Sequence, residues 1–499
     1  MLALWAWGTL LLAVAAALGL IILISGLAAV FQRAPRLEPR GDDGALPDLS
    51  LTLVVPAFNE ASNIGPCLSS ALASDPPCRH WQVLLVDDRS TDDTLARAQA
   101  AVQACGAEAA QRFAWLDAGP RPQAERWVGK NWACSQAMQQ VQSEWVLFVD
   151  ADVRLQPQTL RRALAQAIAD GADLLSLAPR LSCGCLSEWM VQPIMASLLG
   201  LGFPIEAAND PASPVAFAAG PFMLFRRSAY EAIGGHRALA GEVVEDLALA
   251  RRIKGQGYRL RYLLGLEALE LRMYANFASL WEGWTKNWLL GLDGDVLKAL
   301  GAAAVVVLMF SGPWLLAGAS ATALALTMAQ SAAVDPPLMP ALDQPLWLVG
   351  LAVAGLGILL QWLLRLWTRW RFQVPLRHWW LMGAGGLVVG AIGPVSVWRT
   401  LSGRGWTWKG RPLALDKSPP AELSPGGHRP LCTPVCKRMA LRSPWVRLLK
   451  GDDALGMGAG RDQDGLPQAR LAQLPQARRE PVPQRGAWPG TRMLNSLPG

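Results

Sequence analysis

Charged residues are scarce in this sequence. They account for 17% of its 499 residues, whereas hydrophobic residues account for 52% and the mean hydropathy is +0.22. These values lie on the apolar side for a soluble enzyme, so the composition indicates a chain that is partly soluble and partly embedded in a membrane. The length leaves room for one large domain with additions, or for about two or three modest domains.

Charge is absent from residues 2–31, which read "LALWAWGTLLLAVAAALGLIILISGLAAVF". A stretch of this length can cross a hydrocarbon core of about 30 Å. A cleaved signal peptide would need a basic start and a shorter apolar run, so we predict an N-terminal transmembrane anchor. Arg33, Arg36 and Arg40 follow it, and the positive-inside rule places that side in the cytoplasm.

Three further apolar stretches, at about 299–330, 346–364 and 379–398, predict a C-terminal transmembrane region over 299–398 with three or four segments. Gly312-Pro313 leaves the first stretch as either one kinked helix or a re-entrant pair. The loop after it contains neither Lys nor Arg and is expected outside. The loop between the last two stretches is expected inside, because it carries Arg365, Arg369, Arg371 and Arg377.

Four simple spans would place the basic segment 399–411 outside, against its charge. Two alternatives remove the conflict: the glycine-rich stretch 379–398 is re-entrant, or 299–330 crosses twice. The sequence leaves both open.

A disulfide framework is also missing. Eight cysteines are scattered along the chain, and those of the middle region are expected to be reduced thiols in the cytoplasm. Cys432, Cys436 and His428 lack a second pair of ligands, which disfavours a metal site there. Residues 416–499 are rich in Pro, Gly, Arg and Gln without periodicity, so we expect this tail to be disordered.

The net charge of +7 comes largely from residues beside apolar segments and in the tail. This distribution suits an anionic bilayer surface. No recognition helix, ribonucleoprotein motif or zinc finger is found, so no nucleic-acid partner is expected.

Residues 48–290 alternate short β-type runs with helical patterns, which predicts an α/β domain with a mainly parallel sheet. Polar residues follow three of these strands: Asn59-Glu60, Asp87-Asp88, and Asp150 with Asp152. Ligands of open α/β sheets bind beyond the carboxyl ends of the strands, so the three groups are expected to line one crevice. A single acid after a strand is more often a helix cap, and Asp92 and Asp93 are interpreted in that way.

Asp150 and Asp152 are separated by one alanine in "WVLFVDADVRL". An extended chain would point both carboxylates to the same side. They repel each other unless a cation lies between them.

Five ordered segments, "VVPAFNEASNI", "LLVDDRSTDDT", "FVDADV", "AGPFMLFRRSAYEAIGGH" and "EVVEDLALARRIKGQGYRL", resemble the inverting family-2 glycosyltransferases of GT-A fold. The resemblance covers roughly residues 50–290, about half of the chain. The short segment "WKGR" (408–411) is similar to a sequence in carotenoid and hopanoid-associated transferases.

The resemblance implies roles for single residues. Pro56, Asn59 and Glu60 would line the nucleotide pocket, and Asp87 or Asp88 would contact the base or the ribose. Asp150 and Asp152 would hold Mg²⁺ or Mn²⁺ on the diphosphate of the donor, with Asp150 sharing the metal or reaching the ribose. These cations bind carboxylate and phosphate oxygens and neutralise a leaving diphosphate.

Asp246, the second acid of an "ED" pair with Glu245, would be the catalytic base. The two acids begin a predicted helix, whose N-terminal dipole favours a carboxylate there whether or not it is catalytic. A well-placed base contributes roughly 10²–10⁴-fold to the rate.

Two further features concern the donor loop and the acceptor. Gly129-Lys130 precedes a helix, and the resemblance places Lys130 beneath the donor; a solvated lysine is the alternative. Residues 280–292 stand where many processive members carry Q-x-x-R-W, but here the pattern is Trp281, Trp284, Lys286 and Asn287. This departure disfavours polysaccharide synthesis, and these residues either contact the head group of a lipid acceptor or belong to an ordinary interfacial helix.

The sequence therefore predicts an integral protein of the plasma membrane or an internal membrane, with a cytoplasmic catalytic domain. It would transfer a sugar from a nucleotide-sugar donor to a lipid alcohol with inversion, a terpenoid such as a carotenoid or hopanoid being the first choice. A polysaccharide synthase-type enzyme is the alternative. A catalytically silent nucleotide-binding scaffold is an alternative of another class.

Overall fold

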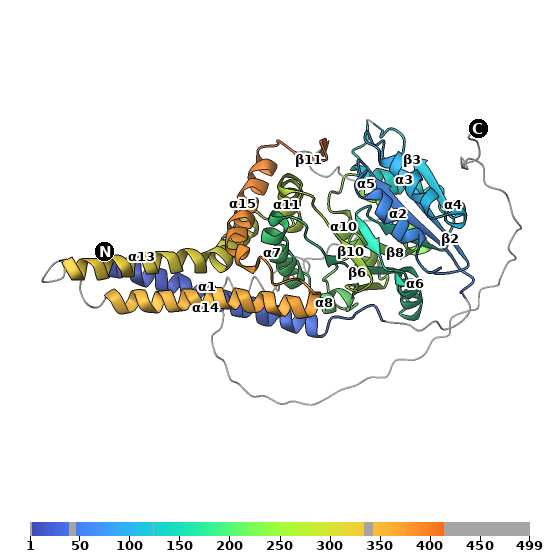
Figure 1. Cartoon of the computed structure of the whole chain (residues 1–499). Coiled ribbons are helices and arrows are strands. Elements are labelled where there is room, and N and C mark those ends of the chain that lie inside the picture. The colour runs from blue at the N-terminus through green and yellow to red at the C-terminus, as the bar shows by residue number, and fades with distance from the viewer. Residues whose placement is uncertain (1, 39–45, 123, 334–342, 414–499) are drawn as a thin grey trace, which may run out of the picture. The chain divides into compact units, whose positions relative to one another are not determined.

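Apolar runs in the middle of the chain form a central sheet that is mainly parallel, as predicted (Figure 1). The computed structural model describes residues 2–38, 46–122, 124–333 and 343–413. The strands of the sheet are, in spatial order, β3 (Phe113–Asp117), β2 (His80–Asp87), β1 (Ser50–Ala57), β4 (Trp145–Val149), β8 (Phe222–Arg226), β6 (Leu174–Ala178) and β9 (Leu260–Leu264). Strand β8 is antiparallel to both of its neighbours, and the other pairs are parallel.

Both faces of the sheet are covered by helices, which explains why its strands are apolar on both sides. Leu53 and Val55 of β1 pack into one core with α2, α3 and α6, whereas Val54 packs into another with α5, α9 and α10. The helices of this domain are α2 (Ile64–Leu72), α3 (Thr94–Ala104), α4 (Ala107–Gln111), α5 (Gly129–Met138), α6 (Thr159–Ala169), α9 (Arg227–Ala232), η1 (His236–Leu239) and α10 (Glu245–Gly255).

A smaller sheet joins β5 (Val153–Leu155), β10 (Leu269–Leu271) and β7 (Arg180–Leu181). Asp150 and Asp152 lie in the short turn between β4 and β5. The expectation of an extended chain at this position was therefore wrong. A turn brings the two carboxylates together where strand alternation was expected to do so.

Four apolar helical segments are long enough to cross a membrane within the described residues, namely Leu4–Gln32, Val296–Ala329, Gln344–Phe372 and Trp379–Leu401. The structure builds them from α1 (Leu2–Gln32), α12 (Val296–Val306), the π-helical turn η2 (Val307–Ser311), α13 (Gly312–Ala333), α14 (Asp343–Phe372), η3 (Trp379–Leu381) and α15 (Met382–Leu401). The π-helical turn ends directly before Gly312-Pro313, so the first C-terminal stretch is one continuous segment with a local irregularity.

Helices α1, α13 and α14 lie side by side, whereas α15 packs on α12, on α7 (Leu186–Gly202) and on α11 (Phe277–Gly291) (Figure 1). A short helix, α8 (Ile205–Asn209), follows α7. Gly385 lets the α15 backbone lie directly against the Met190 carbonyl of α7, where a Cβ atom would collide. Gly386 and Gly390 likewise lie close to Ser311 and Val307, so close helix packing accounts for these glycines of α15. The side of the membrane on which each end lies stays a prediction.

Several other expectations fall outside the residues that the structure describes. These are the tail at 416–499 and the group of Cys432, Cys436 and His428. The six cysteines within the described residues are all unpaired thiols, as expected for the middle of the chain.

Candidate active site

Polar side chains from the carboxyl ends of neighbouring strands gather on one side of the sheet. Glu60 follows β1, Asp88 follows β2 and Asp150 follows β4, and these strands are adjacent in the sheet. Parallel strands end at a common edge, which is where open α/β sheets bind ligands. The structure therefore brings together the three groups that the sequence assigned to one crevice.

A lysine joins two of the predicted site carboxylates. The Lys130 ammonium lies 2.6 Å from Asp150 Oδ1 and 2.7 Å from Glu245 Oε1. Lys130 is the second residue of α5, and Glu245 is the first of α10. Burial opposes charge on Lys130, but the two carboxylates hold its pKa well above the ordinary value. Burial likewise acts to raise the pKa of Glu245, yet its pair with Lys130 keeps that pKa below the ordinary range. The alternative of a solvated Lys130 is thus not what the structure shows.

Asp152 lies beside this ion-pair network without a cation of its own. Its Oδ1 atom is buried and has no hydrogen-bond partner among the described residues. Burial, together with the charges of Asp150 and Glu60, raises the pKa of Asp152 to about 8. A buried carboxylate oxygen without a partner is costly, so the position favours an added cation.

The donor set fits a divalent ion that is only partly held by protein. No cluster of three or more His, Cys, Asp or Glu side chains able to bind an ion alone occurs within the described part of the chain. Mg²⁺ in phosphate-transfer sites is commonly bound through one or two carboxylates plus oxygens of the substrate. Asp150 and Asp152 suit that arrangement.

Asp246 is held at the start of α10 by backbone hydrogen bonds. The Gly220 amide donates to Oδ2 at 3.0 Å, and the Leu247 amide donates to Oδ1 at 2.8 Å. Burial and the neighbouring Glu245 charge nevertheless raise the pKa of Asp246 to about 6. A carboxylate that titrates close to neutrality and is fixed in orientation has the properties of a general base.

Asn59 and Asp87 shape the loop after β2. Asn59 has a left-handed backbone with φ of 51°; its amide donates to Ser90 Oγ at 2.9 Å and its Oδ1 accepts from the Thr91 amide at 2.8 Å. Asp87 Oδ2 accepts from the Ser90 amide at 3.1 Å. Asp92 accepts from the Thr94 amide at 3.0 Å near the start of α3, which fits its interpretation as a cap. These contacts position the loop that forms one wall of a cavity.

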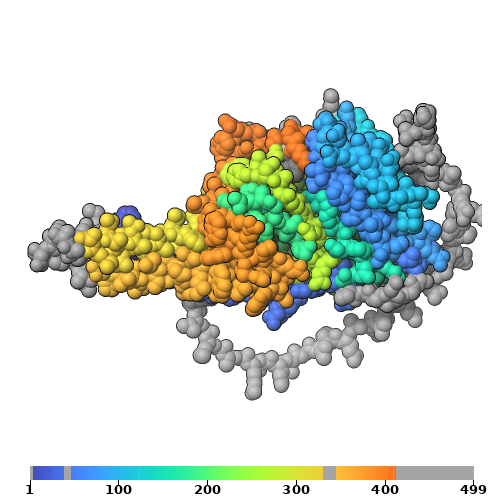
Figure 2. All heavy atoms as spheres, viewed as in Figure 1, coloured from blue at the N-terminus to red at the C-terminus, as the bar shows by residue number. Residues whose placement is uncertain are grey.

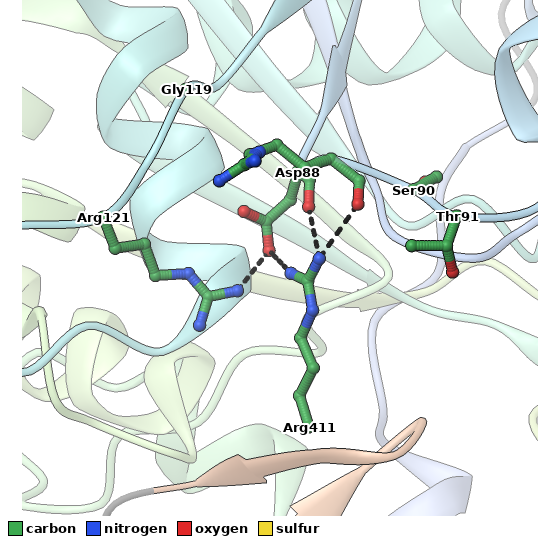
Figure 3. Close-up of a pocket in the computed structure, with 7 residues that line it drawn as sticks. Asp88, Ser90, Thr91, Gly119, Arg121 and Arg411 are labelled. Atoms are coloured by element: carbon green, nitrogen blue, oxygen red, sulfur yellow. Dashed lines mark hydrogen bonds and ion pairs between the residues drawn. The ribbon is translucent and has the colours of Figure 1, made fainter.

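That cavity has a volume of about 550 Å³ and lies beyond the end of β2 (Figure 3). Its lining consists of Asp88, Arg89, Ser90, Thr91, Gly119, Arg121 and Arg411. Asp88 Oδ2 accepts from Arg121 at 2.5 Å and from Arg411 at 2.7 Å. Burial is the largest influence on the Asp88 carboxyl and leaves its pKa raised despite these two cations. Of the residues predicted to bind the donor, Asp88 alone is in this lining, and Pro56 lies inside β1, in register with Val86.

The residues predicted to meet the acceptor lie on α11. Trp284 is buried and its indole donates to Gln192 Oε1 at 2.7 Å, so it holds α11 on α7. Trp281 is half-buried and packs against Phe277, with ring centroids 5.8 Å apart. Burial lowers the pKa of Lys286 on α11. The negative charges of Glu245 and Asp246 act to raise this pKa, but burial is the larger effect. Asn287 is half-buried on the same helix.

Three cations of the crevice were not assigned from the sequence. Arg121 and Arg411 meet on Asp88, and Lys409 lies 2.5 Å from Glu60 Oε1. The segment "WKGR" was noticed only as a resemblance. Its position in the crevice could not be read from local pattern, because Arg411 lies 323 positions after Asp88.

Comparison with known proteins identifies the domain that carries this crevice. Residues 52–234 match the family model described as glycosyl transferase family 2. The similarity to this family therefore extends from β1 to α9. The match agrees with the family resemblance of the motifs, and the mainly parallel sheet confirms the α/β fold class that they predicted.

A curated protein similar to this chain is 4,4'-diaponeurosporenoate glycosyltransferase of Staphylococcus aureus strain MRSA252. It is 29% identical over 264 residues, which are 52% of this chain and 66% of the relative's length, slightly under two thirds. Among solved structures, a mannosyltransferase from Pyrobaculum calidifontis, in complex with GDP-Man and Mn²⁺, matches 77% of this chain and 99% of its own at 17% identity and a TM-score of 0.38. Glucosyl-3-phosphoglycerate synthase from Mycobacterium tuberculosis, with Mg²⁺ and UDP, matches 51% of this chain and 76% of its own at 19% identity and a TM-score of 0.30.

Proposed function

We propose that this protein is an integral membrane glycosyltransferase that transfers a sugar from a nucleotide-sugar donor to a membrane lipid with inversion. One observation carries the proposal most directly. Asp246, a fixed carboxylate whose pKa is raised to about 6, shares a crevice with Asp150 and Asp152, and α11 connects that crevice with the apolar helix α15. The proposed base, the proposed cation site and a helix apolar enough to cross a membrane would thus lie in one continuous region.

The proposed chemistry follows from these groups. A divalent ion held between Asp150, Asp152 and the donor would neutralise the charge that develops on the leaving diphosphate. Asp246 would take the proton from the acceptor hydroxyl as it attacks the sugar carbon from the face opposite to the leaving group, which inverts that carbon. The backbone amides of Gly220 and Leu247 keep the carboxylate of this base in one orientation. Lys130 would hold Asp150 and Glu245 in place by its two ion pairs.

We propose that the acceptor is a lipid alcohol, and the first choice is a terpenoid: a carotenoid, a hopanoid or a polyprenol. The apolar helices favour a lipid over a water-soluble acceptor. A second chemistry has one feature in its favour: α11 carries a basic residue, Lys286, on which the Glu245 and Asp246 charges act, and a basic residue there would suit a lipid carboxylate. The name of the S. aureus relative also designates a carboxylate acceptor. A carboxylate acceptor would need no base, since it is already deprotonated at neutral pH.

We further propose that the catalytic domain faces the cytoplasm. Arg33 and Arg36 at the end of α1, and Arg369, Arg371 and Arg377 after the core of α14, lie at membrane ends where the positive-inside rule predicts the cytoplasmic side. Nucleotide sugars of the cytoplasm would then reach the crevice directly.

Transfer by the purified full-length protein tests the proposal. The protein is placed in lipid nanodiscs with Mn²⁺, a panel of UDP- and GDP-sugars and total lipid of the source membrane, and new glycolipids are sought by mass spectrometry. A glycosylated lipid that disappears with the Asp246→Asn variant is expected for an alcohol acceptor. Formation of a water-soluble polymer would instead identify a polysaccharide synthase. Binding of nucleotide without transfer or donor hydrolysis would identify a silent scaffold.

A further inference from the structure

A hairpin that follows the last apolar helix, α15, reaches the crevice. Strands β11 (Trp406–Trp408) and β12 (Arg411–Leu413) pair directly after α15. Between them, Lys409 has φ of 48° and Gly410 has φ of 78°. Positive φ at both central positions is the geometry of a tight hairpin turn, and it is uncommon for a lysine. The turn thus holds Lys409 in a strained conformation, which structures tend to keep at functional sites.

The two basic residues of this hairpin reach the ends of two strands of the central sheet. Lys409 donates to the carbonyls of Phe58 and Asn59 at 3.1 and 3.0 Å and pairs with Glu60. Arg411 donates to the Asp88 carboxylate at 2.7 Å and to the carbonyls of Asp88 and Arg89 at 2.9 and 3.0 Å. In Figure 2 the orange atoms of this segment accordingly abut the blue atoms of the catalytic domain.

Arg411 also stacks on an aromatic ring at the end of β1. Its guanidinium carbon lies 3.2 Å from the centroid of the Phe58 ring. A planar guanidinium that is stacked on one side and hydrogen-bonded along its edge is fixed in place before a ligand arrives. Such preorganisation lowers the entropy cost of binding.

The charge of the cavity points to an anionic ligand. Arg89, Arg121 and Arg411 line it against the single carboxylate of Asp88. Arg411 and Arg121 keep exposed fractions of 29% and 26% beside an Asp88 side chain that is 5% exposed. Guanidinium groups in this partly open state still have donors for phosphate oxygens.

Helix α11 anchors the hairpin at its other end. Trp406 is buried, and Thr407 Oγ1 donates to Glu282 Oε1 of α11 at 2.5 Å. The same hairpin therefore contacts α11, follows the apolar helix α15, and forms part of the cavity wall.

We propose that the hairpin 406–413 is a wall of the donor site, in which Arg411 and Lys409 bind the nucleoside diphosphate part of the nucleotide sugar. Donor binding thereby depends on a segment that follows the last membrane helix. This inference rests on the proposed function and names two further donor-binding residues for the same site.

Nucleotide binding by the full-length protein in detergent tests the inference apart from transfer. UDP and GDP with Mn²⁺ are titrated by calorimetry into wild type and into the variants Arg411→Ala, Lys409→Ala and Arg411→Lys. We expect Arg411→Ala to lower the affinity for the nucleotide by about 10- to 100-fold, because a charge-assisted hydrogen bond is lost. Lys409→Ala is expected to weaken it by several-fold, and Arg411→Lys to restore part of the loss.

Arg404→Ala is the matched control. Arg404 is an exposed arginine just before the hairpin, stacked on Trp398 at 4.6 Å and not part of the cavity lining, so its loss should leave nucleotide affinity unchanged. Thermal unfolding of each variant shows whether it is folded. Equal or tighter binding by a folded Arg411→Ala protein would overturn the inference while leaving the proposed function intact. If the wild-type protein bound neither UDP nor GDP, the proposed function would instead be overturned.

Discussion

The two ends of the crevice carry opposite charge. At one end lie Asp150, Asp152, Glu245 and Asp246, with Lys130 ion-paired to Asp150 and Glu245. At the other end, three arginines surround the single carboxylate of Asp88. Under the proposed function, the acidic end would hold the divalent ion and the basic end the diphosphate, so a metal-bound nucleoside diphosphate would match both ends. Neither end alone would distinguish this ligand from a simple ion.

The acidic end should show the largest effect when its base is removed. The Asp246→Asn variant is expected to lose about 10²–10⁴-fold in transfer to an alcohol acceptor and to keep its nucleotide affinity, since the base acts on the acceptor. Transfer is measured as initial rates of glycolipid formation, and affinity by calorimetry. Asp93→Asn, at an exposed N-cap without a side-chain hydrogen bond, is the control and should behave as wild type. Full activity of Asp246→Asn would assign the acceptor as a carboxylate.

Removing the unpartnered carboxylate should separate stability from activity. The buried Asp152 Oδ1 has no partner among the described residues, so Asp152→Asn is expected to raise the melting temperature of the metal-free protein by about 2–4 °C. The same variant should lose about 10²–10³-fold in Mn²⁺-dependent transfer, because Lewis-acid stabilisation is worth several kcal/mol. Melting curves with and without Mn²⁺ and nucleotide check both. A variant that still gains stability from Mn²⁺ as wild type does would exclude Asp152 as a ligand.

The strand-end acids and the acidic start of α10 could be predicted from the sequence because local patterns encode them. An apolar run ends, a polar group follows, and a parallel sheet places such ends together. The turn at Asp150–Asp152 could not be predicted, because the short strand β5 begins directly after it. In sequence, two strands separated by so short a turn cannot be distinguished from one continuous strand. The ion pairs of Lys130 depend on how α5 and α10 dock on the sheet.

The basic end was largely hidden for a different reason. Arg121 lies in an irregular segment before α5, and Arg411 reaches Asp88 only because α15 packs on α7 and α11. Such contacts across the whole fold leave no periodic signal in the chain. The glycine-rich sequence of α15 leaves re-entry open as one of two alternatives, and in the structure Gly385 allows close packing on Met190.

The pH dependence of transfer sharpens the comparison at the acidic end. Asp246 must be deprotonated to accept the hydroxyl proton, and its pKa is raised to about 6. Below that pH the active fraction falls about tenfold per unit, and above it the rate should level off. The acid limb of kcat against pH, measured from pH 5 to 8, checks this. An acid limb near the ordinary aspartate value of about 4 would contradict the role of Asp246 as the base.

Loss of the lysine tests whether the acidic end is held together by charge. Lys130→Met leaves Asp150 and Glu245 without their cation, so the free energy of unfolding of the metal-free protein should fall by about 1–3 kcal/mol. Mn²⁺ with nucleotide is expected to recover part of this loss. Lys298→Met is the control, because its pair with Asp295 is largely exposed and should change stability by less than about 0.5 kcal/mol. If the free energy of unfolding of Lys130→Met were unchanged, the ion pairs of Lys130 with Asp150 and Glu245 would not be needed for stability.

The smallest single effect is expected at the basic end, where two arginines share one carboxylate. Arg121→Ala leaves Asp88 paired with Arg411, so nucleotide affinity should fall by about 2- to 5-fold. The double variant Arg121→Ala/Arg411→Ala should lose more than the product of the single losses, since Asp88 would then be buried without a cation. Arg112→Ala, whose partner Glu108 is exposed, is the control. If Arg121→Ala weakened nucleotide affinity as much as Arg411→Ala does, Arg121 and the hairpin would contribute equally to nucleotide binding. The basic end would then not depend chiefly on the hairpin 406–413.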